Sequence, residues 1–225
     1  IWGNHATACS GIISAKTNNN LGVAGIAPNC PVMSISNQLM GTSDAPQKRA
    51  DGFNWAWRNG ASVISNSWRS STFSELLEDA IQSAMTNGRN GLGCVVTFSA
   101  GNYDSNTVGY PARSLPDIIV VGALSLSGKR KSSTTIDNEG WWGSDYGTQL
   151  DIMAPGVLIY TTDRTGSVGY VSGDYMPNFN GTSSACPHVA GVAALILSVN
   201  PNLTQKEVAT IIEKTARKVG GYSYS

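Results

Sequence analysis

Ser183 follows a turn and precedes a helix, a position from which a hydroxyl can act as a nucleophile. It lies in segment 179–191, Phe-Asn-Gly-Thr-Ser-Ser-Ala-Cys-Pro-His-Val-Ala-Gly. The Asn-Gly-Thr before Ser183 predicts a flexible turn, and the apolar, Ala-rich run 189–199 predicts a buried helix. At such a junction the hydroxyl is exposed to substrate and lies near the positive end of a helix, where developing negative charge is stabilised.

A serine nucleophile needs a base, and histidine is the usual one. The chain has two histidines, His5 and His188. His188 comes five residues after Ser183 in the predicted helix, so it lies about 140° around the helix axis, and we expect it to be a packed, hydrogen-bonded core residue. This leaves His5. Taken alone, a histidine so near the chain start is better explained as a terminal residue without a role, but the Ser183 segment favours the catalytic interpretation.

The composition is that of one globular domain. The 225 residues suffice for a sizeable core, and 41% hydrophobic with 13% charged residues argues against a disordered chain or a coiled coil. The formal net charge is +0, which gives no electrostatic basis for binding nucleic acid or an anionic membrane. We find no apolar run of the roughly 18 residues that a membrane span needs, so we expect neither a nucleic-acid nor a membrane partner.

The four cysteines, Cys9, Cys30, Cys94 and Cys186, are scattered. They form no Cys-x-x-Cys pair or Cys/His cluster, which argues against a structural zinc site. Three disulfide pairings and four free thiols are all compatible with the sequence. Cys94 lies in an apolar strand-like run and is most simply a small core residue.

Helix-like and strand-like segments alternate along the chain. Helical spacing of apolar residues predicts helices over 7–14, 45–59, 73–87 and 204–218, and a further helix that begins after Ser183. Thr204 and Glu207 form a capping box at the start of the last of these helices. Strands are predicted over 31–36, 61–66, 94–99, 118–122 and 150–153. Continuous apolar runs are typical of parallel strands covered on both faces. We therefore expect one α/β domain over 1–225, with three αβα layers and a mostly parallel central sheet. Catalytic groups gather at the carboxyl ends of such strands.

The block Gly-Thr-Ser-x-Ala-x-Pro-His-Val-Ala-Gly at Ser183 closely resembles the nucleophile motif of the subtilisin-like serine proteases, the subtilases or peptidase S8 family. Segment 3–11, Gly-Asn-His-Ala-Thr-Ala-Cys-Ser-Gly, resembles the family's His-Gly-Thr-His-Val-Ala-Gly, and Ser-Ala-Gly-Asn at 99–102 resembles the family's oxyanion-binding strand end. Further matches follow in family order at 22–28, 66–68, 109–112 and 151–156. Each short piece is weak alone, but together, in this order, they are highly specific.

The resemblance implies a serine endopeptidase that works through an acyl-enzyme. His5 would take the proton of Ser183, and Asn102 with the backbone N–H of Ser183 would stabilise the oxyanion. It also implies a peptide or protein substrate, no cofactor for catalysis, a monomer and an extracellular location. The substrate-binding residues that it implies are Ser67, Trp68, Arg69, Ser99, Ala100, Gly101 and Gly109.

The third member of the catalytic triad is missing from the matched positions. In subtilisin the Asp precedes the His by roughly thirty residues, whereas four residues precede His5. We therefore expect a catalytic-domain fragment, truncated at both ends, whose Asp lies upstream of Ile1 and which is poorly active or inactive alone. The resemblance places the chain's other candidate carboxylates away from His5: Asp44, Asp51, Asp104 and Asp151.

Two smaller features concern specificity and metal binding. Arg69 stands where the family usually has Gly, so we expect it to narrow the specificity pocket or to favour acidic residues. Segment 18–23, Asn-Asn-Asn-Leu-Gly-Val, resembles a calcium-binding loop of the family. A plain polar turn explains that segment equally well. The candidate structural calcium ligands are Thr17, Asn19, Leu21 and Val23.

Two other functions are alternatives to a serine protease. A non-catalytic relative would keep the groove and bind peptides, but it has no chemical need for His5, Asn102 and Ser183 together. An α/β-hydrolase would need Gly-x-Ser-x-Gly around its nucleophile, and Ser183 does not lie in that pattern.

Overall fold

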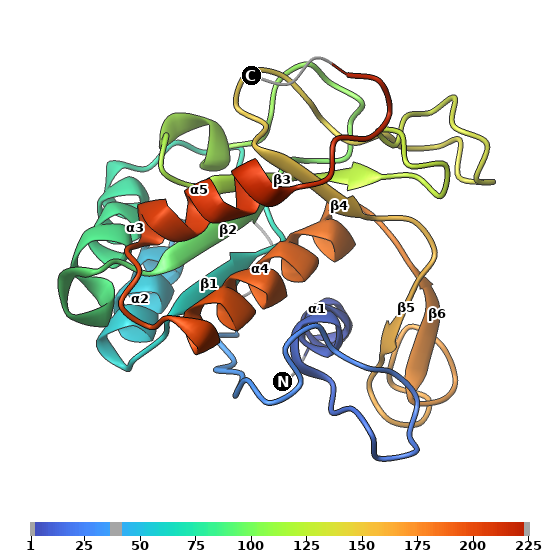
Figure 1. Cartoon of the computed structure of the whole chain (residues 1–225), viewed down its shortest axis with the longest axis horizontal. Helices are drawn as coiled ribbons and strands as arrows, with labels where there is room; N and C mark the ends of the chain where they lie inside the picture. Colours follow the sequence, from blue (N-terminus) through green and yellow to red (C-terminus); the bar gives the residue numbers. More distant parts are fainter. Residues whose placement is uncertain (1–2, 37–41, 223–225) are drawn as a thin grey trace.

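The computed structural model describes residues 3–36 and 42–222. A parallel sheet lies at its centre, with strands in the order β1-β2-β3-β4 (Figure 1). Its strands are β1 (Val63–Asn66), β2 (Val95–Ser99), β3 (Ile119–Leu124) and β4 (Ile152–Pro155). Residues of β2 and β3 are buried almost throughout, which is why their sequences are continuous apolar runs.

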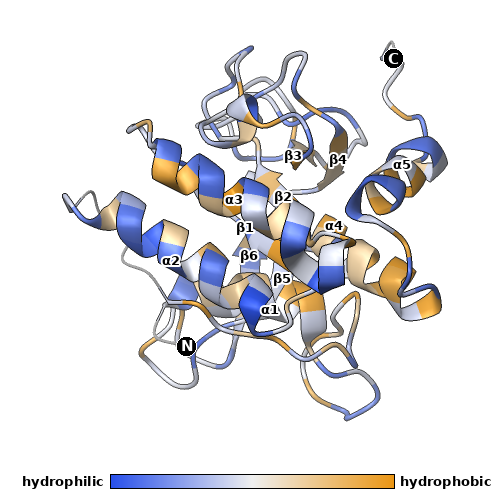
Figure 2. Ribbon diagram, turned by 90° about the vertical axis from the view of Figure 1, so that its left-hand side faces the viewer, coloured by the Kyte–Doolittle hydropathy of each residue, from blue (hydrophilic) through white to orange (hydrophobic). Residues whose placement is uncertain are grey.

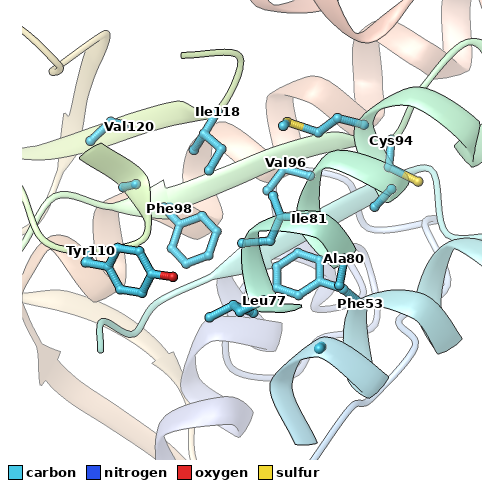
Figure 3. Close-up of a cluster of buried hydrophobic side chains, with 14 of the residues drawn as sticks. Phe53, Leu77, Ala80, Ile81, Cys94, Val96, Phe98, Tyr110, Ile118 and Val120 are labelled. Carbon is cyan, nitrogen blue, oxygen red and sulfur yellow. The ribbon is translucent and has the colours of Figure 1, made fainter. Parts of the chain in front are cut away.

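One face of the sheet is covered by α2 (Ala45–Arg58) and α3 (Glu75–Asn87). Figure 3 shows Phe53 of α2 and Leu77 and Ile81 of α3 packed against Phe98 of β2. The rings of Phe53 and Phe98 are stacked with centroids 6.2 Å apart. In Figure 2 both helices have hydrophilic outer sides, so their apolar stripes are what attach them to the sheet.

The opposite face is covered by α4 (Thr182–Val199) and α5 (Gln205–Thr215). Val95 of β2 and Val121 of β3 point to this side, against apolar residues of both helices. Alternate residues of each strand thus serve two different cores, and the layers are αβα as expected. The fold class predicted from the sequence is confirmed.

Helix α4 corrects one expectation. It is the one helix in the described part of the chain that is long and apolar enough, by length and composition, to cross a membrane. The expectation that no apolar segment reaches 18 residues is therefore wrong. Of this segment, 56% is buried inside the structure, and its apolar residues pack on the sheet.

Helix α1 (Asn4–Ser14) packs against α4 and against a two-stranded antiparallel sheet of β5 (Ile159–Thr162) and β6 (Tyr175–Phe179). Two threonine hydroxyls of β5 donate to carbonyl oxygens of α1, Thr161 to Ala8 (2.7 Å) and Thr162 to Thr7 (2.8 Å). Gly11 permits this approach, because a Cβ there would lie 2.2 Å from the Thr162 hydroxyl. The small sheet thereby fixes the helix that carries His5.

Most predicted elements are present, with shifted ends. The capping box of Thr204 and Glu207 is confirmed, and all four cysteines are free. The prediction of a strand over 31–36 is wrong, because this segment has no strand partner within the described residues. Strands β5 and β6 were not predicted, and β6 contains Pro177, which weakens a strand signal.

Candidate active site

Ser183 is the second residue of α4, next to a turn that requires glycine. Gly181, the N-cap residue, has φ 100°, a conformation that favours glycine. The first N–H groups of a helix have no acceptor within the helix. The N–H of Thr182 donates to Asn102 Oδ1 (2.9 Å), and that of Ser184 to the Gly181 carbonyl (3.0 Å). The N–H of Ser183 has no hydrogen-bond partner among the residues described, so it is available to an oxygen of a bound molecule.

The carbonyl of Ser183 is held from outside the helix. Its usual helical donor would be the N–H of residue 187, but Pro187 has none. The hydroxyl of Ser67, just after β1, donates to this carbonyl instead (2.9 Å), and the thiol of Cys9 on α1 donates at 3.4 Å. Three elements are thus joined at the nucleophile candidate.

His5 lies in the first turn of α1 and is partly buried. Its Nδ1 is 3.8 Å from Cys9 Sγ, one turn further on, and its ring packs edge-on against Phe179 with centroids 5.4 Å apart. Cys9 therefore touches both His5 and the Ser183 backbone. The sequence reasoning missed this role of Cys9, although its i,i+4 spacing from His5 places the two on one helix face.

Burial sets the protonation of this pair. It lowers the pKa of His5 below 6.5, so the imidazole is neutral near pH 7 and can accept a proton. It raises the pKa of Cys9 to about 12, so Cys9 is a neutral thiol and offers no negative charge to an imidazolium. Within residues 3–36 and 42–222, no carboxylate forms an ion pair with His5.

Asn102 follows the end of β2 and is joined to the Ser183 turn. Its Oδ1 accepts from the N–H and from the hydroxyl of Thr182, each at 2.9 Å. A backbone N–H can only donate, which fixes the orientation of the amide. Its Nδ2 has no partner in the described part of the chain. It lies beside Gly181, because a Cβ added to Gly181 would be 3.1 Å from Asn102 Nδ2. Two free donors, this amide and the Ser183 N–H, therefore lie at the same turn.

His188 is hydrogen-bonded, as the sequence predicts, but it is partly buried rather than a core residue. Its Nδ1 lies 2.8 Å from the carbonyl oxygen of Ser184, four residues earlier in α4. It is therefore a hydrogen-bonded residue of this helix.

The predicted substrate-binding residues form two groups. Ser67 bonds to the Ser183 carbonyl, whereas the Trp68 ring turns into the core, edge-on to Phe98 at 5.0 Å. The guanidinium of Arg69 lies 3.7 Å from the centre of the Tyr103 ring. The aliphatic part of its side chain packs against Gly109, where an added Cβ would lie 3.2 Å from Arg69 Cβ.

The second group is the end of β2 with the segment facing it. Ser99, Ala100 and Gly101 are buried, and the N–H of Gly109 donates to the Ala100 carbonyl at 2.9 Å. Arg69 lies over this junction. The structure thus brings Arg69, Ala100 and Gly109 together.

The candidate calcium ligands lie in the exposed loop after α1. Asn19 Oδ1 accepts from the N–H of Leu21 at 3.1 Å, so this oxygen already has a partner within the loop. Segment 17–23 contains no carboxylate, and neutral oxygens alone bind calcium weakly. Among the described residues no group of three or more His, Cys, Asp or Glu could hold a metal ion.

A groove of about 920 Å³ opens beside the outer edge of β1. Its walls are β1 and its flanking residues on one side and segment 30–36 on the other, and His5 and Cys9 line it as well. In the described residues no strand pairs with this edge of β1. The groove therefore leads from an unpaired sheet edge to the candidate base.

Comparison with known proteins gives the family of the chain. A family model described as "Subtilase family" matches residues 2–224. A "Calcium-dependent protease" of Trichormus variabilis is 37% identical over 242 residues, covering 96% of this chain and 35% of that protein. "Subtilisin E" of Bacillus subtilis is 36% identical over 226 residues, covering 98% of this chain and 52% of that protein.

A solved structure, described as a protease from Pseudoalteromonas arctica, is similar to this fold. It superposes with a TM-score of 0.76 at 29% identity, over 95% of this chain and 64% of that one. The chain spans 35% of the calcium-dependent protease and 52% of subtilisin E.

Proposed function

The chain belongs to the subtilase family, and from this premise we propose that it is a large part of the catalytic domain of a serine endopeptidase. Ser183 Oγ attacks the carbonyl carbon of a peptide bond while His5 takes its proton. The protonated His5 then gives this proton to the leaving amine, and water hydrolyses the acyl-enzyme.

One observation carries the proposal. Asn102 Nδ2 and the N–H of Ser183 have no partner among the described residues, while the N–H groups of Thr182 and Ser184 on either side have acceptors. Two free donors beside a nucleophilic hydroxyl are what a tetrahedral oxyanion requires. A domain that only bound peptides would have no need to leave them free, which favours the enzyme over a non-catalytic relative.

We further propose that an aspartate upstream of Ile1 completes the triad. His5 is neutral and has no carboxylate partner among the described residues, and it lines the groove beside β1. A strand entering this groove would pair with the open edge of β1 and could bring a carboxylate to the imidazole. Segment 31–36, which pairs with no strand within the described residues, supports this, because it forms the opposite wall.

We propose further assignments for the metal, the specificity pocket and the location. A calcium ion in loop 17–23 would be held by oxygens of Thr17, Asn19, Leu21 and Val23; relatives named calcium-dependent proteases support it. Arg69, packed over Gly109, would narrow the pocket for the substrate side chain or favour acidic ones. We also propose a monomeric, extracellular enzyme acting on peptides or proteins.

The proposal is tested by labelling with a fluorophosphonate, which reacts with activated serines, followed by peptide mapping. We use the extended protein, meaning the chain together with its native upstream segment. Label is expected on Ser183 and is expected to disappear in Ser183→Ala. Ser198→Ala, an exposed serine at the far end of the same helix, should label normally. Label on another residue, or none, would refute the proposal.

Asn102→Ala is expected to lower kcat by about 10²–10³-fold, the loss measured when the equivalent donor is removed from subtilisin. KM should change little, because the donor acts mainly in the transition state. Peptide hydrolysis by the extended protein is the measurement, and Asn202→Ala, in an exposed turn after α4, is the control. A kcat within a few-fold of wild type would mean that Asn102 does not stabilise the oxyanion.

A further inference from the structure

The long connection between β3 and β4, residues 125–151, reaches both segments that carry the free donors. We propose that this connection, here the β3–β4 loop, positions the oxyanion site through two buried carboxylates, Glu139 and Asp145. The inference rests on the proposed function, since it concerns the geometry of the same site. Both are positioning residues, because they act through Asn180 and through the backbone around Asn102.

The β3–β4 loop has a polar core of its own. The side chain of Lys131 is fully buried and forms an ion pair with Asp137 at 3.3 Å. A buried ammonium is costly unless it is paired and hydrogen-bonded, so its contacts fix the path of the loop. Lys131 Nζ donates to the carbonyls of Ser132 (2.7 Å), Glu139 (2.7 Å) and Trp142 (3.1 Å) and to the Thr135 hydroxyl (3.0 Å).

Glu139 connects this core to the nucleophile turn. Its side chain is 4% exposed, and both carboxylate oxygens accept hydrogen bonds. Oε2 accepts from the Trp142 indole N–H at 2.7 Å, and Oε1 from Asn180 Nδ2 at 3.0 Å. Asn180 directly precedes Gly181, so this bond holds the turn that orients the Ser183 N–H.

Asp145 connects the same loop to the segment of Asn102. It is 1% exposed, and its Oδ1 accepts from the N–H groups of Tyr103 (2.8 Å) and Ser105 (3.0 Å). Its own N–H donates to the Gly101 carbonyl at 2.9 Å. These bonds lie on both sides of Asn102. A Cβ at Gly101 would come within 2.0 Å of Asp145 Oδ2, so the carboxylate lies directly against this backbone.

The two contacts together set the separation of the donors. The Ser183 N–H belongs to the turn held by Glu139, and Asn102 Nδ2 to the segment held by Asp145. Displacements of about 1 Å at a catalytic site can cost about 10²-fold in rate. A loop with a fixed internal core, bonded to both segments, limits such displacements.

The test compares variants that break or keep the Asn180 bond. Glu139→Ala and Asn180→Ala both remove it, and we expect each to lower kcat of the extended protein about 10- to 100-fold with a nearly unchanged KM. Because both oxygens of Glu139 accept, Glu139→Gln alone leaves one donor facing an NH₂ group. The double variant Glu139→Gln/Trp142→Phe removes that donor while glutamine still accepts from Asn180, so its kcat should be close to wild type.

Asp145 is tested in the same way. Asp145→Ala removes the acceptor of the Tyr103 and Ser105 N–H groups, and we expect it to lower kcat about 10- to 100-fold with a nearly unchanged KM. Asp145→Asn keeps an oxygen that can accept from both N–H groups, so it should recover most of that loss. A kcat as low in Asp145→Asn as in Asp145→Ala would mean that charge, and not position, matters, and would overturn the inference.

A double-mutant cycle separates positioning from general stability. In an Asn102→Ala background one donor is already gone, so Glu139→Ala should cost about threefold or less there. Equal losses in both backgrounds, or an unchanged kcat for Glu139→Ala and Asn180→Ala, would refute the inference. Asn180 is only partly buried, so we expect Asn180→Ala to fold. This variant therefore tests the same hydrogen bond if Glu139→Ala does not fold. Failure of the proposed function itself would appear earlier, as a wild-type protein that the fluorophosphonate does not label.

Discussion

Ser183→Ala and His5→Ala, each in the extended protein, are expected to lower turnover about 10⁶-fold, and the double variant hardly further. In subtilisin, losing either the serine or the histidine costs nearly as much as losing the whole triad, about 2 × 10⁶ in kcat. The reason is chemical: a neutral hydroxyl without a base is a poor nucleophile, and a base without the hydroxyl has nothing to activate.

The measurement is single-turnover hydrolysis of a peptide substrate, with KM recorded separately. KM should change little, because neither side chain is needed to hold the substrate backbone. The matched controls are Ser198→Ala and His188→Ala; the latter removes a ring whose Nδ1 lies at the Ser184 carbonyl. If His188→Ala lost as much turnover as His5→Ala without unfolding, or if the losses at Ser183 and His5 multiplied, the assignment of His5 as the base would be wrong.

The sequence predicted those parts of the molecule that local patterns determine. The Ser183 turn, the end of β2 at Asn102 and the capping box at Thr204 each depend on a few neighbouring residues, and each is found where its pattern lies. His188 is hydrogen-bonded within its own helix, in which residues five apart lie about 140° from each other around the axis.

What the sequence did not predict depends on long-range packing. Segment 31–36 has the composition of a strand, but a strand forms only where another strand can pair with it, and no partner is present among the described residues. Cys9 touches Ser183 because α1 packs on α4, and Glu139 meets Asn180 across 41 residues. No local pattern encodes such contacts, since many folds are compatible with each residue taken alone.

The second large effect concerns the upstream aspartate. Chain 1–225 alone is expected to be labelled by a fluorophosphonate about 10⁴-fold more slowly than the extended protein, close to the factor of about 3 × 10⁴ that loss of this Asp costs in subtilisin. Without a carboxylate, nothing orients the His5 ring or stabilises the imidazolium that forms when it takes the proton. The two neighbours of the His5 ring, the Phe179 ring and the Cys9 thiol, are both uncharged, so neither can stabilise the imidazolium.

The pH dependence of labelling gives an independent readout. Catalysis requires neutral His5, so the rate rises with pH through the pKa of His5. In the chain alone burial lowers this pKa below 6.5, and the half-maximal rate is expected below that pH. A carboxylate beside the imidazole favours the charged form and raises the pKa, so the extended protein should reach half its maximal rate at a higher pH.

Replacing the upstream aspartate by asparagine separates chemistry from folding. This variant still fills the groove beside β1, so it should fold as the extended protein does, yet it should label as slowly as the chain alone. Its pH midpoint should also fall again, because asparagine carries no charge. If chain 1–225 and the asparagine variant both labelled at the rate of the extended protein, with the same pH midpoint, no upstream carboxylate would act on His5, and the groove beside β1 would have no role in the reaction.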